Sequence, residues 1–275
     1  MPILTPIEQI LWLLGASVLL FAGLWLAQRR TGDAGIVDVG WSYGVALAAI
    51  IVALTGAGSA WHRVVIGTMI GLWGLRLGTH ILTDRVLTGR EDGRYQMARE
   101  KFGARFQPFM FVFYQLQALS VPLLALAPIA VAATARPTIG PLALTGIALY
   151  FAGVAGETVA DAQLARFKKD PANRGRTCRA GLWRYSRHPN YFFEWLLWIA
   201  YALVASDSPL WWLALVPVAV MYLLLTRVTG IPPTEAQSLR SRGEEYRAYQ
   251  RETSAFFPWF PRSSTPPASP AKDLQ

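Results

Sequence analysis

Several ionisable residues of this 275-residue chain lie within apolar segments, where a charged side chain is costly and usually serves a function. Glu157 and Asp161 are four residues apart, a spacing that places both side chains on one face of a helix. Two carboxylates in that position repel each other, and the negative end of a helix dipole increases the repulsion. Since helix stability does not favour this pair, we expect it to bind a polar ligand or cationic partners.

The four-residue spacing recurs in two other segments. Asn190 and Glu194 share a helix face, as do Arg76 and His80, and Asp38 lies near the start of a further apolar segment. Two structural explanations remain open. Arg76 could pair with a carboxylate, and Asp38 could stabilise a helix N-terminus, where acidic side chains are favoured.

Basic segments lie next to these polar residues in the sequence. Arginine binds phosphate through two parallel hydrogen bonds, so an arginine-rich loop suits a phosphate-bearing ligand. We therefore expect the polar residues to line a cavity in the inner half of a membrane, with basic loops covering it.

The elements that must position these residues are membrane helices. Hydrophobic residues make up 53% of the chain and charged residues 16%, and a helix needs about 20 mostly apolar residues to cross a bilayer. The sequence predicts an all-α integral membrane protein with a single domain at residues 1–261, followed by a disordered Ser-, Pro- and Ala-rich tail at 262–275. The seven expected spans are 7–27, 35–55, 64–83, 109–134, 139–165, 190–206 and 209–227.

The distribution of Lys and Arg predicts the orientation of these spans. Of 26 basic residues, 23 fall in four segments that share one side if the first helix begins outside, namely 28–34, 84–108, 166–189 and 227–275. Cytoplasmic loops carry such an excess of basic residues. The sequence thus predicts seven transmembrane helices with the N-terminus outside and the C-terminus in the cytoplasm.

Other observations exclude whole classes of function. One cysteine, Cys178, and three histidines make a metal site improbable, so no metal is expected. Glycine-rich nucleotide-binding motifs of soluble folds are missing. The net charge of +9 fits contact with anionic membrane lipid and an anionic ligand, and no nucleic-acid partner is expected. Arginine greatly outnumbers lysine, which favours a GC-rich bacterial source and a location in the bacterial inner membrane.

A resemblance to known enzymes is concentrated in the motif Arg-His-Pro-Asn-Tyr at residues 187–191, which enters a predicted helix and is followed by Glu194. The motif resembles a superfamily of membrane enzymes that includes steroid 5-alpha-reductases, sterol reductases and isoprenylcysteine carboxyl methyltransferases. Over roughly residues 150–260 the chain is similar to the bacterial steroid 5-alpha-reductase-like family (DUF1295). That similarity is carried by Glu157-x-x-x-Asp161-x-Gln163, Asn173-Arg174-Gly175 and Thr253-Ser254-x-Phe256-Phe257-Pro258-Trp259.

The resemblance implies an NADPH-dependent oxidoreductase that reduces a conjugated carbon–carbon double bond in a hydrophobic, steroid-like enone. It also implies that the cofactor lies among the helices near the cytoplasmic face. Glu157 departs from the pattern of the eukaryotic enzymes, which have Asn at that position. The residues expected to contact NADPH are Glu157, Asp161, Arg176, Arg187, His188, Asn190, Tyr191, Glu194, Tyr246 and Tyr249.

The catalytic residues are expected at the oxygen of the substrate carbonyl. Hydride addition to an enone places negative charge on that oxygen, and a preorganised hydrogen-bond donor lowers the barrier. Steroid reductases hold the ketone with a Glu on the second helix and a Tyr on the following polar helix. Asp38 falls near the Glu position, whereas the stretch 75–80 contains no Tyr. We therefore expect Asp38, Arg76 and His80 to be catalytic, with Tyr43 and Tyr95 as other candidate donors.

Two other functions remain open. The first is an S-adenosylmethionine-dependent methyltransferase of the isoprenylcysteine carboxyl type, because that class shares the Arg-His-Pro-x-Tyr motif. The pattern of Glu157, Asp161 and Gln163 favours the reductase. The second is a non-enzymatic lipid-binding or transport protein, to which helix-breaking prolines would be suited, although the chain shows no internal repeat.

Overall fold

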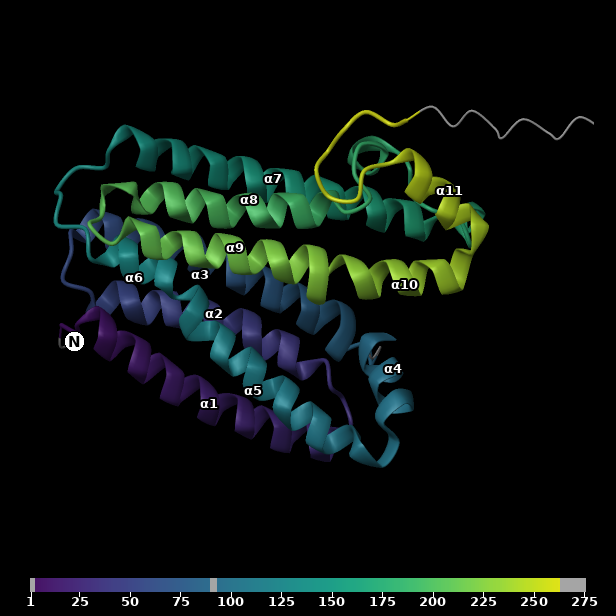
Figure 1. Ribbon diagram of the computed structural model, residues 1–275, viewed down its shortest axis with the longest axis horizontal. Coiled ribbons are helices and arrows are strands. Elements are labelled where there is room, and N and C mark those ends of the chain that lie inside the picture. Colours follow the sequence, from purple (N-terminus) through teal and green to yellow (C-terminus); the bar gives the residue numbers. More distant parts are fainter. Residues whose placement is uncertain (1–2, 90–92, 263–275) are drawn as a thin grey trace, which may run out of the picture. The chain divides into compact units, whose positions relative to one another are not determined.

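The computed structural model describes residues 3–89 and 93–262, and every regular element in those ranges is helical (Figure 1). Six helical stretches are long and apolar enough to cross a membrane, which confirms a multi-pass helical membrane protein. They are Pro6–Thr31, Ile36–Thr55, Ala60–Asp84, Gly93–Ala132, Pro141–Lys169 and Trp211–Arg242. The expected disordered tail lies almost wholly outside the described residues.

The span expected at 190–206 is not confirmed, because the helix found there is shorter than the other candidate spans. It forms the 16-residue helix α8, Pro189–Val204, followed by a 3-10 turn at Ala205–Asp207. At a rise of 1.5 Å per residue α8 is about 24 Å long, which is less than the roughly 30 Å of a hydrocarbon core. The difference arises because α8 begins at Pro189, which lacks a backbone donor, and tightens into the 3-10 turn at its other end.

The chain divides into two compact units, Met1–Val154 with Trp195–Leu224 and Ala155–Glu194 with Leu225–Gln275. The first unit begins with α1 (Pro6–Thr31), α2 (Ile36–Thr55) and α3 (Ala60–Ile81), and continues through a π-turn at Leu82–Val86. It then contains α4 (Gly93–Phe102), α5 (Phe106–Leu124), α6 (Leu126–Ala132), the start of α7 (Pro141–Lys169), most of α8 and α9 (Leu215–Leu223).

Local sequence explains where these helices begin and end. Thr5 and Glu8 form a reciprocal capping box at the start of α1, and Gly32 ends the helix in the left-handed conformation at φ 78°. The break between α5 and α6 falls at Ala125. Pro128 explains it, since a proline ring clashes with the carbonyl four residues earlier, that of Leu124.

Small residues bring α2 and α3 into close contact in the first unit. A Cβ atom added at Gly74 would lie 2.6 Å from both the Ser42 carbonyl oxygen and the Ala46 Cβ. Helices in lipid associate through such close packing, because their apolar surfaces gain little by leaving the lipid tails. In agreement, large apolar side chains such as Leu19 (75% exposed) and Trp12 (69% exposed) on α1 face outward.

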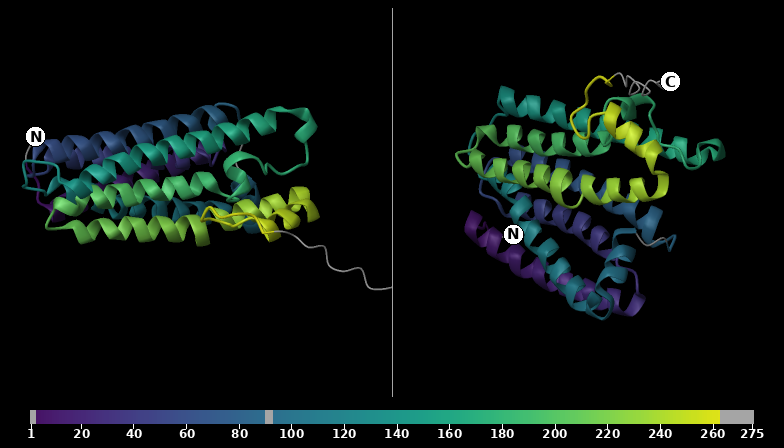
Figure 2. Two further views of the ribbon diagram at one scale, coloured as in Figure 1. Left: turned by 90° about the horizontal axis from the view of Figure 1, so that it is seen from above. Right: turned by 45° about the vertical axis from the view of Figure 1, so that its right-hand side comes forward.

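The second unit contains the end of α7, the start of α8 and two short C-terminal helices. Between α7 and α8 run 3-10 turns at Pro171–Asn173 and Gly181–Arg184. Helix α10 (Ile231–Arg242) starts with Pro232 and Pro233 in its first turn, and α11 (Glu244–Glu252) follows after Gly243 and turns back beside it (Figure 2).

Candidate functional site

All ten residues expected to contact NADPH belong to the second compact unit. They come from the end of α7, the connection to α8, the first turns of α8 and helix α11. They are separated by up to 92 residues in the sequence, and one compact unit contains all of them. The three residues expected to be catalytic, Asp38, Arg76 and His80, belong to the first unit. Their roles and those of the ten stay predictions.

The carboxylate of Glu235 on α10 is the centre of a hydrogen-bond network in the second unit. Its Oε1 accepts from Arg187 Nε at 2.6 Å, His188 Nε2 at 3.2 Å and the Tyr246 hydroxyl at 3.4 Å. Its Oε2 accepts from Gln250 Nε2 at 2.7 Å. Three of these donors are expected site residues, so one carboxylate connects the Arg-His-Pro motif to α10 and α11.

Arg187 is held firmly in this network. Besides Glu235, its guanidinium donates through Nη1 to the carbonyl oxygens of Gln250, at 3.0 Å, and Thr253. The backbone amide of Arg187 donates to the Ser254 carbonyl at 2.8 Å. These contacts give Arg187 a positioning role in addition to any ligand contact.

His188 is almost completely buried, and burial lowers its pKa. The nearby Glu235 carboxylate opposes that shift, while the charge of Arg187 adds to it. Its ring stacks on that of Tyr191, with centroids 5.3 Å apart and planes 6° from parallel. The Tyr191 hydroxyl in turn lies 3.3 Å from Thr234 Oγ1 on α10.

Tyr249 on α11 is also fully buried. Its hydroxyl donates to the carbonyl oxygens of Trp183 and of Ser186, the latter at 3.2 Å, and burial raises its pKa. Arg179 lies 5.4 Å above the Tyr249 ring and pairs with Glu252 at 3.0 Å. Tyr249 therefore fixes the loop before the Arg-His-Pro motif.

Asp161 on α7 and Asn190 on α8 contact each other. Asn190 Nδ2 donates to Asp161 Oδ1 at 3.2 Å. Because a carboxylate only accepts, the amide nitrogen must face Asp161, and the amide oxygen points elsewhere. Asn190 Oδ1 is buried and has no hydrogen-bond partner among the described residues. It is an acceptor available to a ligand that carries an N–H group.

The other expected cofactor residues differ in exposure. Glu157 and Glu194 are buried, with 6% and 7% of their surfaces exposed. Arg176 is exposed and follows a basic stretch whose side chains are also exposed, namely Arg166, Lys168, Lys169 and Arg174.

These features fit NADPH in two respects. Asn190 Oδ1 can accept from the carboxamide N–H of a nicotinamide, and the exposed arginines can bind phosphate groups.

In the first unit, Asp38 on α2 is paired with two residues of α4. Its Oδ2 accepts from Arg94 Nη2 at 2.8 Å, and its Oδ1 accepts from the Tyr95 hydroxyl at 2.9 Å. The Tyr95 side chain is buried, with 3% exposed. The structure thus brings an acid of the second helix together with a tyrosine, although the tyrosine comes from α4 and not from the stretch 75–80.

Arg76 and His80 lie on the last turns of α3. Arg76 is half-buried, whereas the His80 side chain is exposed and makes no hydrogen bond or ion pair within the described part of the chain. Tyr43, the other candidate donor, lies with its hydroxyl 3.1 Å from Thr79 Oγ1.

Sequence reasoning missed Glu235, Gln250 and Thr234, and it named Tyr95 only as another candidate. Glu235 lies in a stretch that looked like an ordinary basic C-terminal segment. The sequence did contain one signal for this helix. Pro232 and Pro233 favour the start of a helix, and its first turns contain Thr234 and Glu235.

The fold and composition define a multi-pass helical membrane protein. A family model described as a protein of unknown function (DUF1295) matches residues 24–253. The chain belongs to the DUF1295 family.

A protein of the fission yeast Schizosaccharomyces pombe, described as uncharacterized, is 40% identical over 102 residues. That match covers 34% of this chain and 27% of the relative's length. No solved structure is significantly similar to the chain.

Proposed function

We propose that this protein is an NADPH-dependent membrane reductase that saturates a conjugated carbon–carbon double bond in a lipid enone, of the steroid 5-alpha-reductase type. The observation that carries the proposal is the pairing of Asp161 with Asn190, which leaves a buried amide oxygen without a partner among the described residues. The same compact unit holds all the other residues expected to contact the cofactor.

On the cofactor side, each group has a chemical task. Asn190 Oδ1 would accept from the nicotinamide carboxamide, and Asp161 holds the Asn190 amide in that orientation. Arg176 and the neighbouring exposed basic side chains would bind the phosphates. When bound, NADPH would supply the hydride that attacks the β carbon of the enone.

On the substrate side, Tyr95 is the strongest candidate for the donor to the carbonyl oxygen. Its hydroxyl donates to Asp38 in the structure and would donate to the substrate oxygen in the reaction, where it would stabilise the negative charge of the enolate. Arg94 would keep the Asp38 charge compensated during that exchange, since it binds the other carboxylate oxygen. Transfer of a proton from solvent to the α carbon of the enolate would then complete the saturated ketone.

The proposal extends to topology and location. We propose that α8 also crosses the membrane, giving seven spans with the N-terminus outside and the C-terminus in the cytoplasm. The supporting observation is the gathering of 23 of 26 basic residues in the segments that this arrangement places inside. A bacterial inner membrane remains a prediction, and the fission yeast relative indicates that similar proteins are not confined to bacteria.

Cofactor binding tests this proposal. A ligand that binds only the folded state stabilises it by about 2.7 kcal/mol at a concentration 100 times its Kd. NADPH should therefore raise the unfolding temperature of the purified protein by several degrees. Asn190→Ala should remove most of that rise, whereas Gln237→Ala, on an exposed site of α10, should retain it.

The same assay separates the methyltransferase alternative. Stabilisation by S-adenosylmethionine, with no response to NADPH, would contradict the reductase and favour methyl transfer. An Asn190→Ala protein with an unchanged NADPH response would show that the cofactor site has been placed wrongly.

A further inference from the structure

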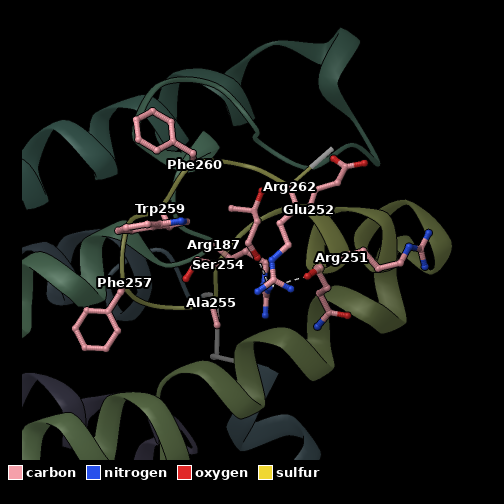
Figure 3. Close-up of a pocket in the computed structure, with 11 residues that line it drawn as sticks. Arg187, Arg251, Glu252, Ser254, Ala255, Phe257, Trp259, Phe260 and Arg262 are labelled. Carbon is pink, nitrogen blue, oxygen red and sulfur yellow. Dashed lines mark hydrogen bonds between the residues drawn. The ribbon is translucent and has the colours of Figure 1, made fainter. Parts of the chain in front are cut away.

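A cavity of about 400 Å³ lies in the second unit between helix α11 and the segment 253–262 that follows it (Figure 3). Its volume is within the range of roughly 300–1,000 Å³ that small-molecule sites occupy. Phe257, Trp259 and Phe260 lie on one side, and Arg187 and Arg262 lie near the centre. Arg251 lies at the edge of the cavity, and its side chain extends away from the aromatic residues. Arg187 is also an expected cofactor contact, whereas Asn190, Asp161 and the proposed catalytic residues do not line this cavity.

The three aromatic side chains are unusually exposed. Phe257, Trp259 and Phe260 are 49%, 72% and 75% exposed, and they lie within four consecutive residues. Neighbouring exposed aromatic residues mark a surface that contacts a partner or a membrane. Tryptophan favours the headgroup level of a bilayer, because its ring is apolar and its N–H needs a polar partner.

The exposure of these side chains is not a consequence of a loose chain end. The backbone amide of Trp259 donates to the Tyr185 carbonyl at 2.9 Å, and that of Arg262 donates to the Glu252 carbonyl at 2.8 Å. Pro258 and Pro261 further restrict the backbone, since proline fixes φ. The fold therefore holds an aromatic surface in place.

Within the part of the chain that the structure describes, two arginines at the cavity lack a strong ion pair and can bind an anionic ligand. Glu235 binds Arg187, and Arg179 binds the Glu252 carboxylate that also lines the cavity. Among the described residues, Arg251 pairs with Glu244 alone, at 3.9 Å between two exposed side chains, and such a pair is weak. Arg262 has no ion pair within the described residues.

We propose that this cavity binds the phosphate headgroup of an anionic phospholipid. Arg262 holds the phosphate, Arg251 adds positive charge at the edge of the cavity, and Trp259 and Phe260 lie among the adjoining lipid. Charge complementarity selects an anionic lipid, and the exposed aromatic surface selects a lipid over a free phosphate. Lipid binding requires neither cofactor nor enone, and the two arginines to be tested, Arg251 and Arg262, are not among the expected cofactor contacts.

Lipid retention tests the proposal. The full-length protein is reconstituted in nanodiscs of phosphatidylcholine mixed with phosphatidylglycerol, extracted in mild detergent, and analysed by native mass spectrometry for bound lipid. Wild type should retain phosphatidylglycerol in preference to phosphatidylcholine. Each basic side chain contributes about fivefold in affinity for an anionic lipid, so R251Q/R262Q should lose about 25-fold. W259A/F260A should also reduce retention.

Arg247→Gln is the matched control, because Arg247 is an exposed arginine of α11 that does not line the cavity. It should retain phosphatidylglycerol as wild type does. R251K/R262K should recover part of the loss, which separates a binding defect from a folding defect.

Three results would overturn the proposal. The first is an equal loss in Arg247→Gln, which would indicate unspecific charge attraction. The second is displacement of the lipid by millimolar inorganic phosphate, which would indicate a site for a soluble anion. The third is unchanged retention in W259A/F260A, which would indicate that the aromatic surface serves a protein partner instead.

Discussion

Tyr95 and Asp38 are the residues on which the proposed chemistry depends most directly. The Tyr95 hydroxyl and the Arg94 guanidinium each donate to one oxygen of Asp38, and Arg94 compensates the charge of the acid. This arrangement separates two tasks. Tyr95 would donate to the substrate oxygen, and Asp38 would hold Tyr95 in position.

Removing the Tyr95 hydroxyl should therefore slow the reaction without weakening cofactor binding. Loss of one donor to a developing oxyanion costs roughly 100-fold in kcat or more, so Tyr95→Phe should fall by about that factor. Its NADPH-induced rise in unfolding temperature should match that of wild type. Tyr43→Phe is the control, and we expect its kcat to stay within about twofold. The opposite pattern would assign the donor role to Tyr43.

His188 makes stability depend on pH. Burial lowers its pKa in the folded protein, whereas the unfolded chain has the ordinary value of about 6.5. Between these two values the unfolded chain binds the extra proton, so acid favours unfolding. Stability should be fully present above about pH 6.5 and should fall by up to about 1.4 kcal/mol per pH unit below it.

Unfolding of the wild type and of His188→Gln, followed between pH 7.5 and pH 5.5, measures this effect. The slope should be much smaller in the variant. An equal slope in both proteins would mean that another group titrates.

At the scale of elements, Glu235 connects α10 to α11 and to the motif that precedes α8. Its four donors come from positions 11 to 48 residues away. Removing one partner of a buried ion pair leaves the other charge uncompensated, which typically costs about 3–5 kcal/mol. The Arg187 and Glu235 side chains are 11% and 14% exposed, so that penalty applies here with little solvent screening.

Glu235→Gln should accordingly lower the free energy of unfolding by about 3 kcal/mol. The matched control is Glu244→Gln, whose partner Arg247 is exposed, and it should change stability by less than about 0.5 kcal/mol. Thermal unfolding in detergent compares the two variants. Similar effects for both would show that Glu235 is not the centre of the network.

Several elements were predictable because their signals are local. Six apolar runs of about 20 residues gave six spans, and the pairing of Asp161 with Asn190 joins two polar positions that spacing had singled out separately. The span expected at 190–206 ended two residues beyond α8, because the backbone tightens into a 3-10 turn at Ala205–Asp207. Glu235 and Tyr95 could not be placed, because each meets its partners through contacts between segments distant in sequence.

At the scale of the whole molecule, the basic residues predict which loops face the cytoplasm. Thr138 lies in an expected outside loop and Lys169 in an expected inside segment, and both are exposed. Each is replaced by cysteine in a Cys178→Ser background. A membrane-impermeant maleimide should label Thr138→Cys in intact cells and Lys169→Cys only after permeabilisation. The reverse pattern would invert the proposed topology.

Turnover tests the central claim most directly. The purified protein is incubated with NADPH and a panel of enones that includes 3-oxo-4-ene steroids, while NADPH consumption and product mass are both measured. We predict that one enone gains two hydrogens for each NADPH consumed, and that Asn190→Ala and Tyr95→Phe abolish or greatly slow this reaction. Methyl transfer from S-adenosylmethionine to a lipid acceptor, with no NADPH consumed on any enone, would contradict the account.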